Sequence, residues 1–289
     1  MLIDKLSGTK NQMKEFKDKY GPWALITGAS AGIGKEIARQ VAERGLNVAL
    51  AARRSDKLEE LAAELWESYG IQTRTIACDL GRQDFLETLD KASEGLEIGL
   101  LINNAGAPSY RGSILDRSSA DLANTIHFNV HVQAMLAYHY GKKMALRGRG
   151  GIIQVASMTG HFSMPHMTEY SASKAYQIRF GECLHYEFEK LGVDVLVLSP
   201  GATKTERLDF GMDVKPVVRA GLRNLGRRPS MVTGLLNQLV VFRNRHLWSR
   251  KKVIRKMGDM QAESLGLQQG WQREVSSQPR NTDSKASTS

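Results

Sequence analysis

The chain has 289 residues, of which 42% are hydrophobic, and a formal net charge of +10. A chain of this length can bury one large core, and no change of composition divides it into halves. No stretch approaches the roughly 18 consecutive apolar residues of a membrane span, and the first twenty residues lack the apolar run of a signal peptide. We therefore expect a soluble, cytoplasmic protein.

The cysteine and histidine content argues against a disulfide framework and against a metal site. Cys78 and Cys183 lie far apart within apolar segments, a usage typical of a reducing compartment. No spacing of Cys, His, Asp or Glu resembles a metal-binding motif. We predict that the protein has no metal site.

The positive charge is concentrated near the C-terminus. Twelve lysines and arginines and no acidic residue lie between Val214 and Gly258, so the rest of the chain carries a small net negative charge. Because the basic character belongs to one segment rather than to the whole chain, we do not expect nucleic acid as the partner.

Short apolar runs alternate with stretches of helical period over most of the chain. The runs predict strands at Trp23–Thr27, Asn47–Ala51, Gln72–Ala77, Ile98–Ile102, Gly151–Ala156 and Val193–Leu198. The stretches between them predict helices near 32–44, 55–69, 82–94, 120–147 and 168–191. This alternation implies right-handed crossovers and an α/β fold, with a parallel sheet covered by helices on both faces. Ligands of such sheets bind at the carboxyl ends of the strands.

A glycine-rich loop follows the first predicted strand, within ITGASAGIGKEIARQ, Ile26 to Gln40. Gly28, Gly32 and Gly34 allow backbone angles and close approaches that a Cβ would prevent. The next helix directs free N–H groups and the positive end of its dipole at the loop. The loop is suited to hold a pyrophosphate, although such a turn also lets any strand pack tightly on a helix.

The end of the second predicted strand indicates which dinucleotide is preferred. A carboxylate there would bind a ribose 2′-OH, but the sequence has Ala52 followed by Arg53 and Arg54. A guanidinium is suited to a 2′-phosphate. The missing acid favours NADP, and the alternative is that the two arginines belong to a solvated loop.

Two later strands end in polar segments. INNAG, which contains Asn103 to Gly106, follows the fourth strand as a tight turn, and Ser157 follows the fifth. A serine at a strand end can hydrogen-bond a substrate oxygen, but it is also a common turn residue or helix cap. Asn129 lies in the middle of the predicted 120–147 helix, where asparagine favours a kink or a bound water.

YSASK places Tyr170 and Lys174 one turn apart on the same face of the 168–191 helix. An ammonium beside a phenol stabilises the phenolate and lowers the pKa of the phenol from about 10. The pair is therefore predicted to donate a proton to a carbonyl near neutral pH. By itself this spacing is common on helix surfaces.

Six motifs resemble, in order and spacing, those of the short-chain dehydrogenase/reductase family. They are TGASAGIG, NNAG, Asn129, Ser157, YSASK and SPGATKT, which runs from Ser199 to Thr205. The resemblance covers about residues 20 to 206. It implies a single Rossmann-type doubly wound domain and hydride transfer between NADP(H) and a carbonyl/alcohol pair.

The resemblance also implies roles for individual residues. Tyr170 would be the general acid in reduction and the general base in oxidation, while Ser157 would orient the substrate oxygen. Lys174 would hold the nicotinamide ribose and lower the pKa of Tyr170, and Asn129 would anchor a water that continues the proton relay. The expected cofactor contacts are Gly28, Ser30, Gly32, Ile33, Gly34, Arg53, Asp79, Asn103, Ala105, Gly106, Tyr170, Lys174, Pro200, Gly201, Thr203 and Thr205.

Two of these contacts are more specific. Asp79 would meet the adenine, with a capping role as its alternative, and the Pro200–Gly201 turn with Thr205 would meet the carboxamide. The segment between Ser157 and Tyr170 is expected to border the substrate. Its apolar residues, which predict a lipophilic ketone (acyl, steroid-like or similar), are Met158, Phe162, Met164 and Met167. Its two histidines, His161 and His166, are expected to be loop residues, with contact to the substrate as the alternative.

The chain departs from the family pattern after Thr205. We expect an N-terminal lead-in (1–20), a catalytic core (21–206), a substrate lid and basic helical part of the same domain (207–275), and a disordered tail (276–289). The basic part combines leucines with a cationic cluster, so 228–256 is a candidate for contact with an anionic membrane surface. Its alternative is a helix that covers the pocket or packs on another subunit.

Two further alternatives remain at this level. The helices at 120–147 and 168–191 resemble the pair through which family members form dimers or tetramers, although their apolar stripes would look the same in a monomer. The chain is also compatible with a catalytically silent NADP sensor or binding module that uses its basic segment. The retained Tyr170 and Lys174 favour the enzyme.

Overall fold

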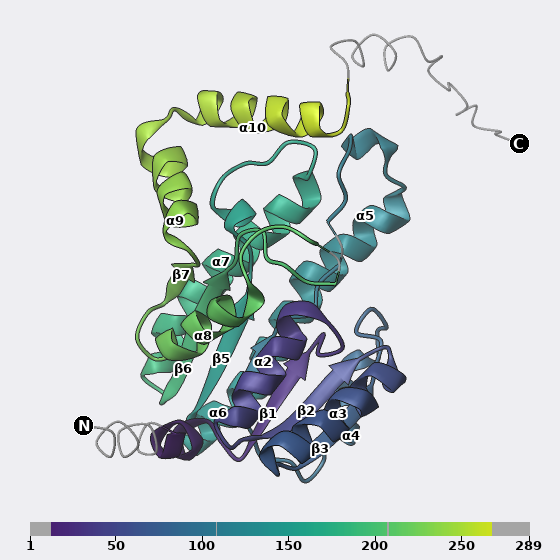
Figure 1. The fold of residues 1–289 in the computed structure, drawn as a ribbon, viewed down its shortest axis with the longest axis vertical. Helices are drawn as coiled ribbons and strands as arrows, with labels where there is room; N and C mark the ends of the chain where they lie inside the picture. The colour runs from purple at the N-terminus through teal and green to yellow at the C-terminus, as the bar shows by residue number, and fades with distance from the viewer. Residues whose placement is uncertain (1–12, 108, 207, 268–289) are drawn as a thin grey trace, which may run out of the picture.

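The computed structural model describes residues 13–107, 109–206 and 208–267, which form a seven-stranded parallel sheet covered by helices (Figure 1). The strands are β1 (Trp23–Thr27), β2 (Asn47–Ala52), β3 (Thr73–Ala77), β4 (Ile98–Asn103), β5 (Gly150–Val155), β6 (Val193–Ser199) and β7 (Ser230–Val232). Their order across the sheet is β3-β2-β1-β4-β5-β6-β7. The order reverses between β1 and β4, where doubly wound sheets bind their ligands.

The α-helices connect these strands and continue beyond them. They are α2 (Gly32–Glu43), α3 (Ser55–Tyr69), α4 (Phe85–Ala92), α5 (Ser119–Ile126), α6 (Val132–Arg147), α7 (Thr168–Glu189), α8 (Val214–Asn224), α9 (Leu235–Phe242) and α10 (Arg250–Ser264). The 3₁₀ segments are η1 (Ile114–Asp116) and η3 (Met158–His161), and the π-helical segments are η2 (His127–His131) and η4 (Arg243–Leu247). Residues 13–20 are also helical.

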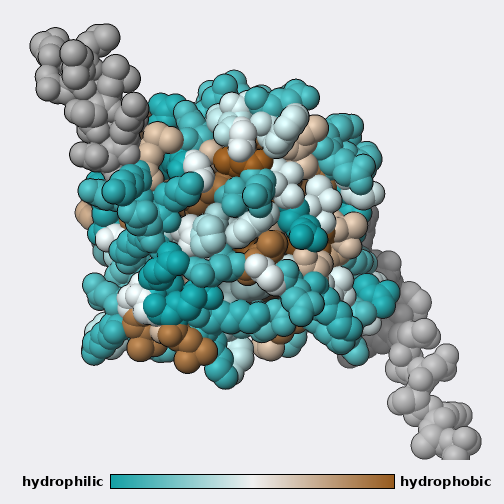
Figure 2. Space-filling view, turned by 90° about the horizontal axis from the view of Figure 1, so that it is seen from below, coloured by the Kyte–Doolittle hydropathy of each residue, from teal (hydrophilic) through white to brown (hydrophobic). Residues whose placement is uncertain are grey.

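The sheet separates two hydrophobic clusters. Neighbouring residues of β1 point to opposite faces, so Ile26 belongs to the cluster that contains Ile37 of α2, and Leu25 belongs to the cluster that contains Leu136 of α6. Both faces of the central strands are therefore apolar, which is why the strands read as continuous apolar runs in the sequence. The face seen in Figure 2 is mainly hydrophilic, with small separate hydrophobic areas.

The predicted parallel α/β sheet is confirmed, and the bounds of the six predicted strands agree within one residue. The predicted helix at 120–147 is not continuous, because η2 interrupts it between α5 and α6. Asn129 lies at the centre of η2 and is fully buried. Asn129 therefore coincides with a break in the regular α-helical hydrogen bonding.

The C-terminal part adds β7 to the edge of the sheet and then forms two helices rather than one. Val253 and Met257 of α10 form a small buried cluster with Met164 and Met167, which precede α7. α10 therefore covers this segment, which the sequence predicted to border the substrate (Figure 1). The predicted tail at 276–289 lies outside the described residues.

No helix in the described part of the chain is both long and apolar enough to cross a membrane. Within the same residues, no group of three or more Cys, His, Asp and Glu side chains is arranged to hold a metal ion.

Candidate active site

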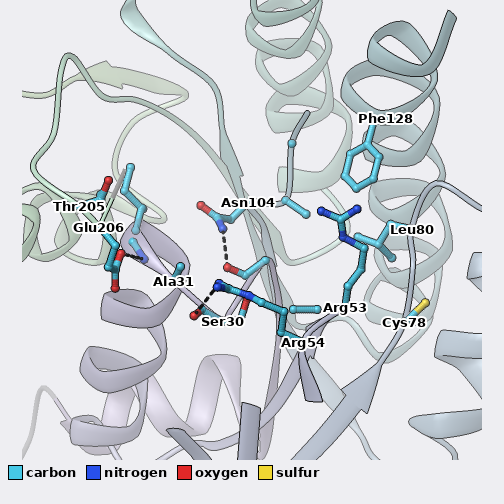
Figure 3. Close-up of a pocket in the computed structure, with 16 residues that line it drawn as sticks. Ser30, Ala31, Arg53, Arg54, Cys78, Leu80, Asn104, Phe128, Thr205 and Glu206 are labelled. Atoms are coloured by element: carbon cyan, nitrogen blue, oxygen red, sulfur yellow. Dashed lines mark hydrogen bonds between the residues drawn. The ribbon is translucent and has the colours of Figure 1, made fainter. Parts of the chain in front are cut away.

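A cavity of about 410 Å³ lies at the carboxyl ends of β1, β2 and β4, next to the point where the strand order reverses (Figure 3). Its walls come from the loops after these strands, from η2 and from the segment after β6. Of the predicted cofactor contacts, the residues that line it are Gly28, Ser30, Gly32, Ile33, Arg53, Ala105, Gly106 and Thr205. The glycine-rich loop therefore forms one wall, as the sequence predicted.

The loop after β1 requires glycine for two different reasons. Gly28 and Gly32 have φ angles of +67° and +56°, which side chains rarely tolerate. A Cβ on Gly34 would lie 2.3 Å from the Gly28 carbonyl oxygen, so α2 approaches the loop closely only because that side chain is missing. Gly34 therefore packs beneath the loop rather than lining the cavity.

The first turn of α2 has an anionic partner that the sequence did not predict. The backbone N–H of Gly32 donates to Oε2 of Glu206 at 2.9 Å, while the N-cap residue Ala31 offers no side-chain cap. Burial alone would raise the pKa of Glu206, but hydrogen bonds from its own amide and from Gly32, with the charges of Lys35 and Arg54, lower it. Its carboxylate therefore lies where the helix favours an anion.

The two arginines after β2 extend in different directions along the cavity wall (Figure 3). Arg53 points towards Phe128 of η2. Arg54 donates through Nη2 to the carbonyl oxygen of Ser30 at 3.2 Å and to its hydroxyl at 3.1 Å. Both guanidinium groups are thus available to an anionic ligand beside the glycine-rich loop. Phe128 was not predicted, because only the turn of η2 brings it to this wall.

Asn103 does not line the cavity, in contrast to the expectation. Its fully buried Nδ2 donates to the carbonyl of Gln133 at 2.8 Å and to Oε1 of Gln154 at 2.9 Å. Asn104 lines the cavity instead and donates through Nδ2 to the carbonyl of Thr27 at 2.9 Å. Successive residues at the end of a strand point to opposite sides, so Asn103 faces the interior and Asn104 faces the cavity.

Asp79 is also absent from the cavity wall, which its neighbours Cys78 and Leu80 line. Its carboxylate accepts a hydrogen bond from the N–H of Gly81 at 3.0 Å. This bond closes a turn after β3, and it is not the helix cap that the sequence left as an alternative, because the N-cap residue of α4 is Asp84.

The segment after β6 reaches the cavity through Thr205 and Glu206, whereas Pro200, Gly201 and Thr203 do not line it. A Cβ on Gly201 would lie 2.4 Å from the side-chain nitrogen of Asn237 in α9. Thr203 is buried and donates its hydroxyl to the Gly201 carbonyl at 3.0 Å. The start of this segment therefore packs against α9, which the sequence did not predict.

Ser157, Tyr170 and Lys174 are brought together at the edge of the cavity. Ser157 lies beside Tyr170, where its hydroxyl acts to lower the pKa of the phenol, and Lys174 Nζ lies 5.6 Å from the centroid of the Tyr170 ring. A Cβ on Gly106, which lines the cavity, would be 3.8 Å from Lys174 Nζ. The three predicted side chains are therefore close to one another and reach the cavity only by way of Gly106, because none of them lines it; for Tyr170 and Lys174 this differs from the predicted cofactor contact.

The ionisation of this group differs from the prediction. Burial raises the pKa of Tyr170 above its usual 10, and the hydrogen bond with Ser157 opposes the increase. Burial lowers the pKa of Lys174 to about 7. A buried amine that readily gives up its charge stabilises a phenolate less than a solvated ammonium would. For the protein alone, the expected lowering of the phenol pKa is therefore wrong.

Asn129 has protein partners for its side-chain amide and its backbone carbonyl. Its Oδ1 accepts from the N–H of Ala107 at 2.8 Å, and its Nδ2 donates to the hydroxyl of Ser173 at 3.2 Å. Its backbone carbonyl accepts from Nε2 of Gln177 at 2.7 Å. Sequence reasoning missed Gln177, whose signal was a polar residue on the buried face of the 168–191 helix.

The two histidines of the segment before α7 have different surroundings. His161 Nε2 lies 3.1 Å from the Ser199 hydroxyl in a hydrogen bond, and burial lowers the pKa of His161 to about 4. His166 has a φ angle of +63°. Phe162 and Trp248 pack around the buried Met164 and Met167, so this side of Tyr170 has an apolar wall.

Comparison with known proteins gives a consistent result. A model of the short chain dehydrogenase family matches residues 22–210. A 7beta-hydroxysteroid dehydrogenase from Clostridium sardiniense is 32% identical over 256 residues, which are 85% of this chain and 97% of that protein. A very-long-chain 3-oxoacyl-CoA reductase from Anas platyrhynchos is 36% identical over 218 residues, which are 71% of this chain and 69% of that protein.

A solved structure supports the same assignment. The short-chain dehydrogenase from Sphingobium yanoikuyae in complex with NADPH superposes with a TM-score of 0.69 at 26% identity, covering 92% of this chain and 99% of that one. The family match spans the glycine-rich loop, Ser157, Tyr170 and Lys174. The resemblance inferred from the motifs is confirmed, and the chain belongs to the short-chain dehydrogenases, a family of oxidoreductases.

Proposed function

We propose that the protein is an NADP(H)-dependent oxidoreductase that transfers a hydride between the nicotinamide and a carbonyl/secondary alcohol pair, with Tyr170 as the general acid and base. The observation that carries this proposal is the position of Lys174 Nζ, 5.6 Å from the centroid of the Tyr170 ring, with Ser157 beside the same phenol. This group lies next to Gly106, at the edge of the cavity. A proton donor and a dinucleotide-sized cleft are thus adjacent.

The residues of the cavity fit a phosphorylated dinucleotide. Gly28 and Gly32 form a cradle that a Cβ would fill, beside the N-terminus of α2. Arg53 and Arg54 would hold a 2′-phosphate, which NAD lacks. When bound, the cofactor supplies or accepts the hydride. The NADPH complex of the Sphingobium yanoikuyae relative supports the same choice.

The protein residues would supply the proton and the orientation. In reduction, the Tyr170 phenol would donate its proton to the substrate oxygen, which also accepts a hydrogen bond from Ser157. Lys174 would bind the ribose hydroxyls through its remaining donor. In the reverse direction, Tyr170 would take the proton from the alcohol.

We propose a lipophilic ketone as the substrate. The segment that precedes Tyr170 forms an apolar wall with α10, in which Met164 and Met167 pack with Val253 and Met257. Methionine-rich walls adapt to bulky apolar ligands. A hydroxysteroid dehydrogenase and a 3-oxoacyl-CoA reductase among the relatives support a steroid-like or acyl ketone.

The test is NADPH oxidation with ketones of increasing chain length and ring number. We expect turnover to rise with the apolar size of the ketone. A protein that binds NADPH but oxidises it with none of the ketones, and that is retained on DNA in a salt-dependent manner, would instead be the silent sensor. The complete Ser157, Tyr170 and Lys174 group favours the enzyme.

We also propose that the protein forms a homodimer or homotetramer through α6 and α7. These helices expose large apolar side chains, which are Tyr138 and Leu146 of α6 and Tyr176 and Tyr186 of α7. Neighbouring apolar side chains on a surface mark interaction sites. Light scattering after gel filtration measures the mass, and a monomer at micromolar concentration would contradict this proposal.

We propose that the protein is cytoplasmic and that one of its faces contacts a membrane. Leu235 and Leu236 of α9 are 78% and 79% exposed, and Leu239 and Phe242 lie exposed on the same helix. The following residues include seven lysines and arginines before the next acid, Asp259. An apolar face beside cations suits an anionic bilayer surface. Flotation with anionic but not with neutral vesicles is expected, and flotation with neither contradicts the contact.

For the domain organisation, we propose that 207–275 belongs to the same domain as the 21–206 core. The pairing of β7 with β6 supports this within the described residues, as does the packing of α10 on the segment before α7.

A further inference from the structure

Gln177 is fully buried in α7, one turn after Lys174, and bridges two elements of the active site. Its Oε1 accepts a hydrogen bond from Lys174 Nζ at 2.9 Å, and its Nε2 donates to the carbonyl oxygen of Asn129 at 2.7 Å. Both ends of the carboxamide therefore have partners, which determines its orientation. This chain of bonds links Lys174 directly to η2.

The carbonyl that Gln177 caps lies in a π-helical segment. A π-helical segment interrupts the regular pairing of backbone groups between consecutive turns. Asn129 lies at the centre of such a segment, and its side-chain oxygen and nitrogen bond to Ala107 and Ser173. An uncapped carbonyl at this depth would cost free energy unless a water or a side chain donated to it.

The bridge leaves Lys174 with one free donor. A lysine ammonium has three N–H groups, and the structure commits one to Gln177 and one to the Val155 carbonyl at 3.1 Å. The third is left for the side where the Tyr170 ring and Gly106 lie. That side is the edge of the cavity.

We propose that Gln177 is a positioning residue, which fixes the Lys174 ammonium and occupies the place of the water that the sequence predicted beside Asn129. This inference rests on the proposed function, because it concerns the same reaction. A neutral carboxamide accepts and donates hydrogen bonds but does not exchange protons as a water does. The inner side of Lys174 is therefore closed to proton transfer, and protons reach Tyr170 from the cleft.

The surroundings of Lys174 make its charge sensitive to this one neighbour. The groups that face it are the neutral Val155 carbonyl of β5, the Gln177 amide of α7 and the loop at Gly106, and Tyr170 is the titratable neighbour. Burial lowers the pKa of Lys174 to about 7. A carboxylate at position 177 would stabilise the ammonium, and an apolar side chain would remove an acceptor from it.

The test is an NMR titration of the Lys174 side chain with ¹³Cε-labelled lysine, in the wild type, Gln177→Glu and Gln177→Leu. The signal is assigned by its loss in Lys174→Arg. We expect the pKa of Lys174 to rise in Gln177→Glu and to fall in Gln177→Leu, each by about one unit or more. Shifts in the same direction, or none beyond 0.3 units in folded variants, would overturn the proposal.

The pH dependence of kcat provides a second readout, because a purely structural role would not shift it in opposite directions. The pH at which activity is lost as Lys174 deprotonates should rise in Gln177→Glu and fall in Gln177→Leu. Gln40→Leu removes another buried glutamine, bonded to Glu36 and the Lys215 carbonyl, far from this group. This control should leave the pH profile unchanged. The titration needs no turnover, so a wild type that reduces no ketone would contradict the proposed function but not this inference.

Discussion

The carboxylate of Glu206 accepts a hydrogen bond from the backbone N–H of Gly32, with 2.9 Å between Oε2 and N. The two residues are 174 positions apart, and the contact joins the segment after β6 to the first turn of α2. A helix N-terminus attracts an anion through its dipole and free N–H groups. The same site is the one proposed for the cofactor pyrophosphate, so the carboxylate and the phosphates compete for it.

Replacing Glu206 with Gln should tighten NADPH binding. The change removes one negative charge from the helix N-terminus, which is worth about 0.3–1 kcal/mol, or roughly twofold to fivefold in Kd. Titration calorimetry at low salt measures the effect, with Glu60→Gln as an exposed control on α3. Weaker binding in Glu206→Gln would indicate that the carboxylate supports the loop instead.

Replacing Tyr170 with Phe should abolish turnover and leave nucleotide binding intact. The phenol supplies the proton, and loss of a general acid lowers rates by about 10²–10⁴-fold. Tyr176→Phe, in the same helix, serves as the control. Steady-state kinetics and NADPH fluorescence titration separate the two effects. Activity within tenfold of the wild type in Tyr170→Phe would rule out its role as the acid.

Replacing Arg53 or Arg54 with Ala should narrow the preference for NADPH over NADH. Each guanidinium lines the cavity, and a charge-assisted hydrogen bond to a phosphate contributes about 1.5–3 kcal/mol, or roughly tenfold or more in Kd. NADH binding should change little, because that cofactor lacks the 2′-phosphate. Arg74→Ala, on the edge strand β3, is the control. An unchanged ratio of the two Kd values in both variants would contradict the NADP assignment.

In the His161→Gln variant, the free energy of unfolding should decrease less on acidification than in the wild type. Burial lowers the pKa of His161 from 6.5 to about 4, so between these pH values the unfolded chain binds more protons than the folded one. The free energy of unfolding therefore falls as the pH decreases from 6.5 to 4, by at most about 3 kcal/mol from this residue.

Urea unfolding at pH 7 and pH 4.5 measures this contribution in both proteins. The wild type should lose more stability than His161→Gln over this interval. Equal losses in the two proteins would show that His161 is not responsible.

Local sequence signals predicted the fold with little error. Each strand of the central sheet is a continuous apolar run, because both of its faces are buried. Such a run can be recognised from the sequence without knowledge of the tertiary structure. The glycines of the loop after β1 were equally clear, because the positive φ angles of Gly28 and Gly32 are a backbone requirement. Asn129 marked the position of η2 because asparagine is a poor helix former.

The wrong or missing predictions concern the direction in which a side chain points and the residues to which it hydrogen-bonds. Asn103 and Asn104 are adjacent and carry the same side chain. Only the packing at the end of β4 shows that Asn104, and not Asn103, reaches the cavity. Gln177 and Glu206 were missed because their partners, Asn129 and Gly32, are distant in sequence. The pKa of Tyr170 was misjudged because its shift comes mainly from burial, which the YxxxK spacing does not encode.

By itself, the sequence determined the order and type of the elements, the glycine-rich loop and the set of reactive side chains. These features follow from backbone conformation and from periodic burial, which act over a few residues. Tertiary structure alone decided which polar atoms meet, how α10 covers the segment before Tyr170 and how strongly Lys174 is desolvated. Those properties depend on close packing between distant parts of the chain, and hydrogen bonding and desolvation change over distances of about 1 Å.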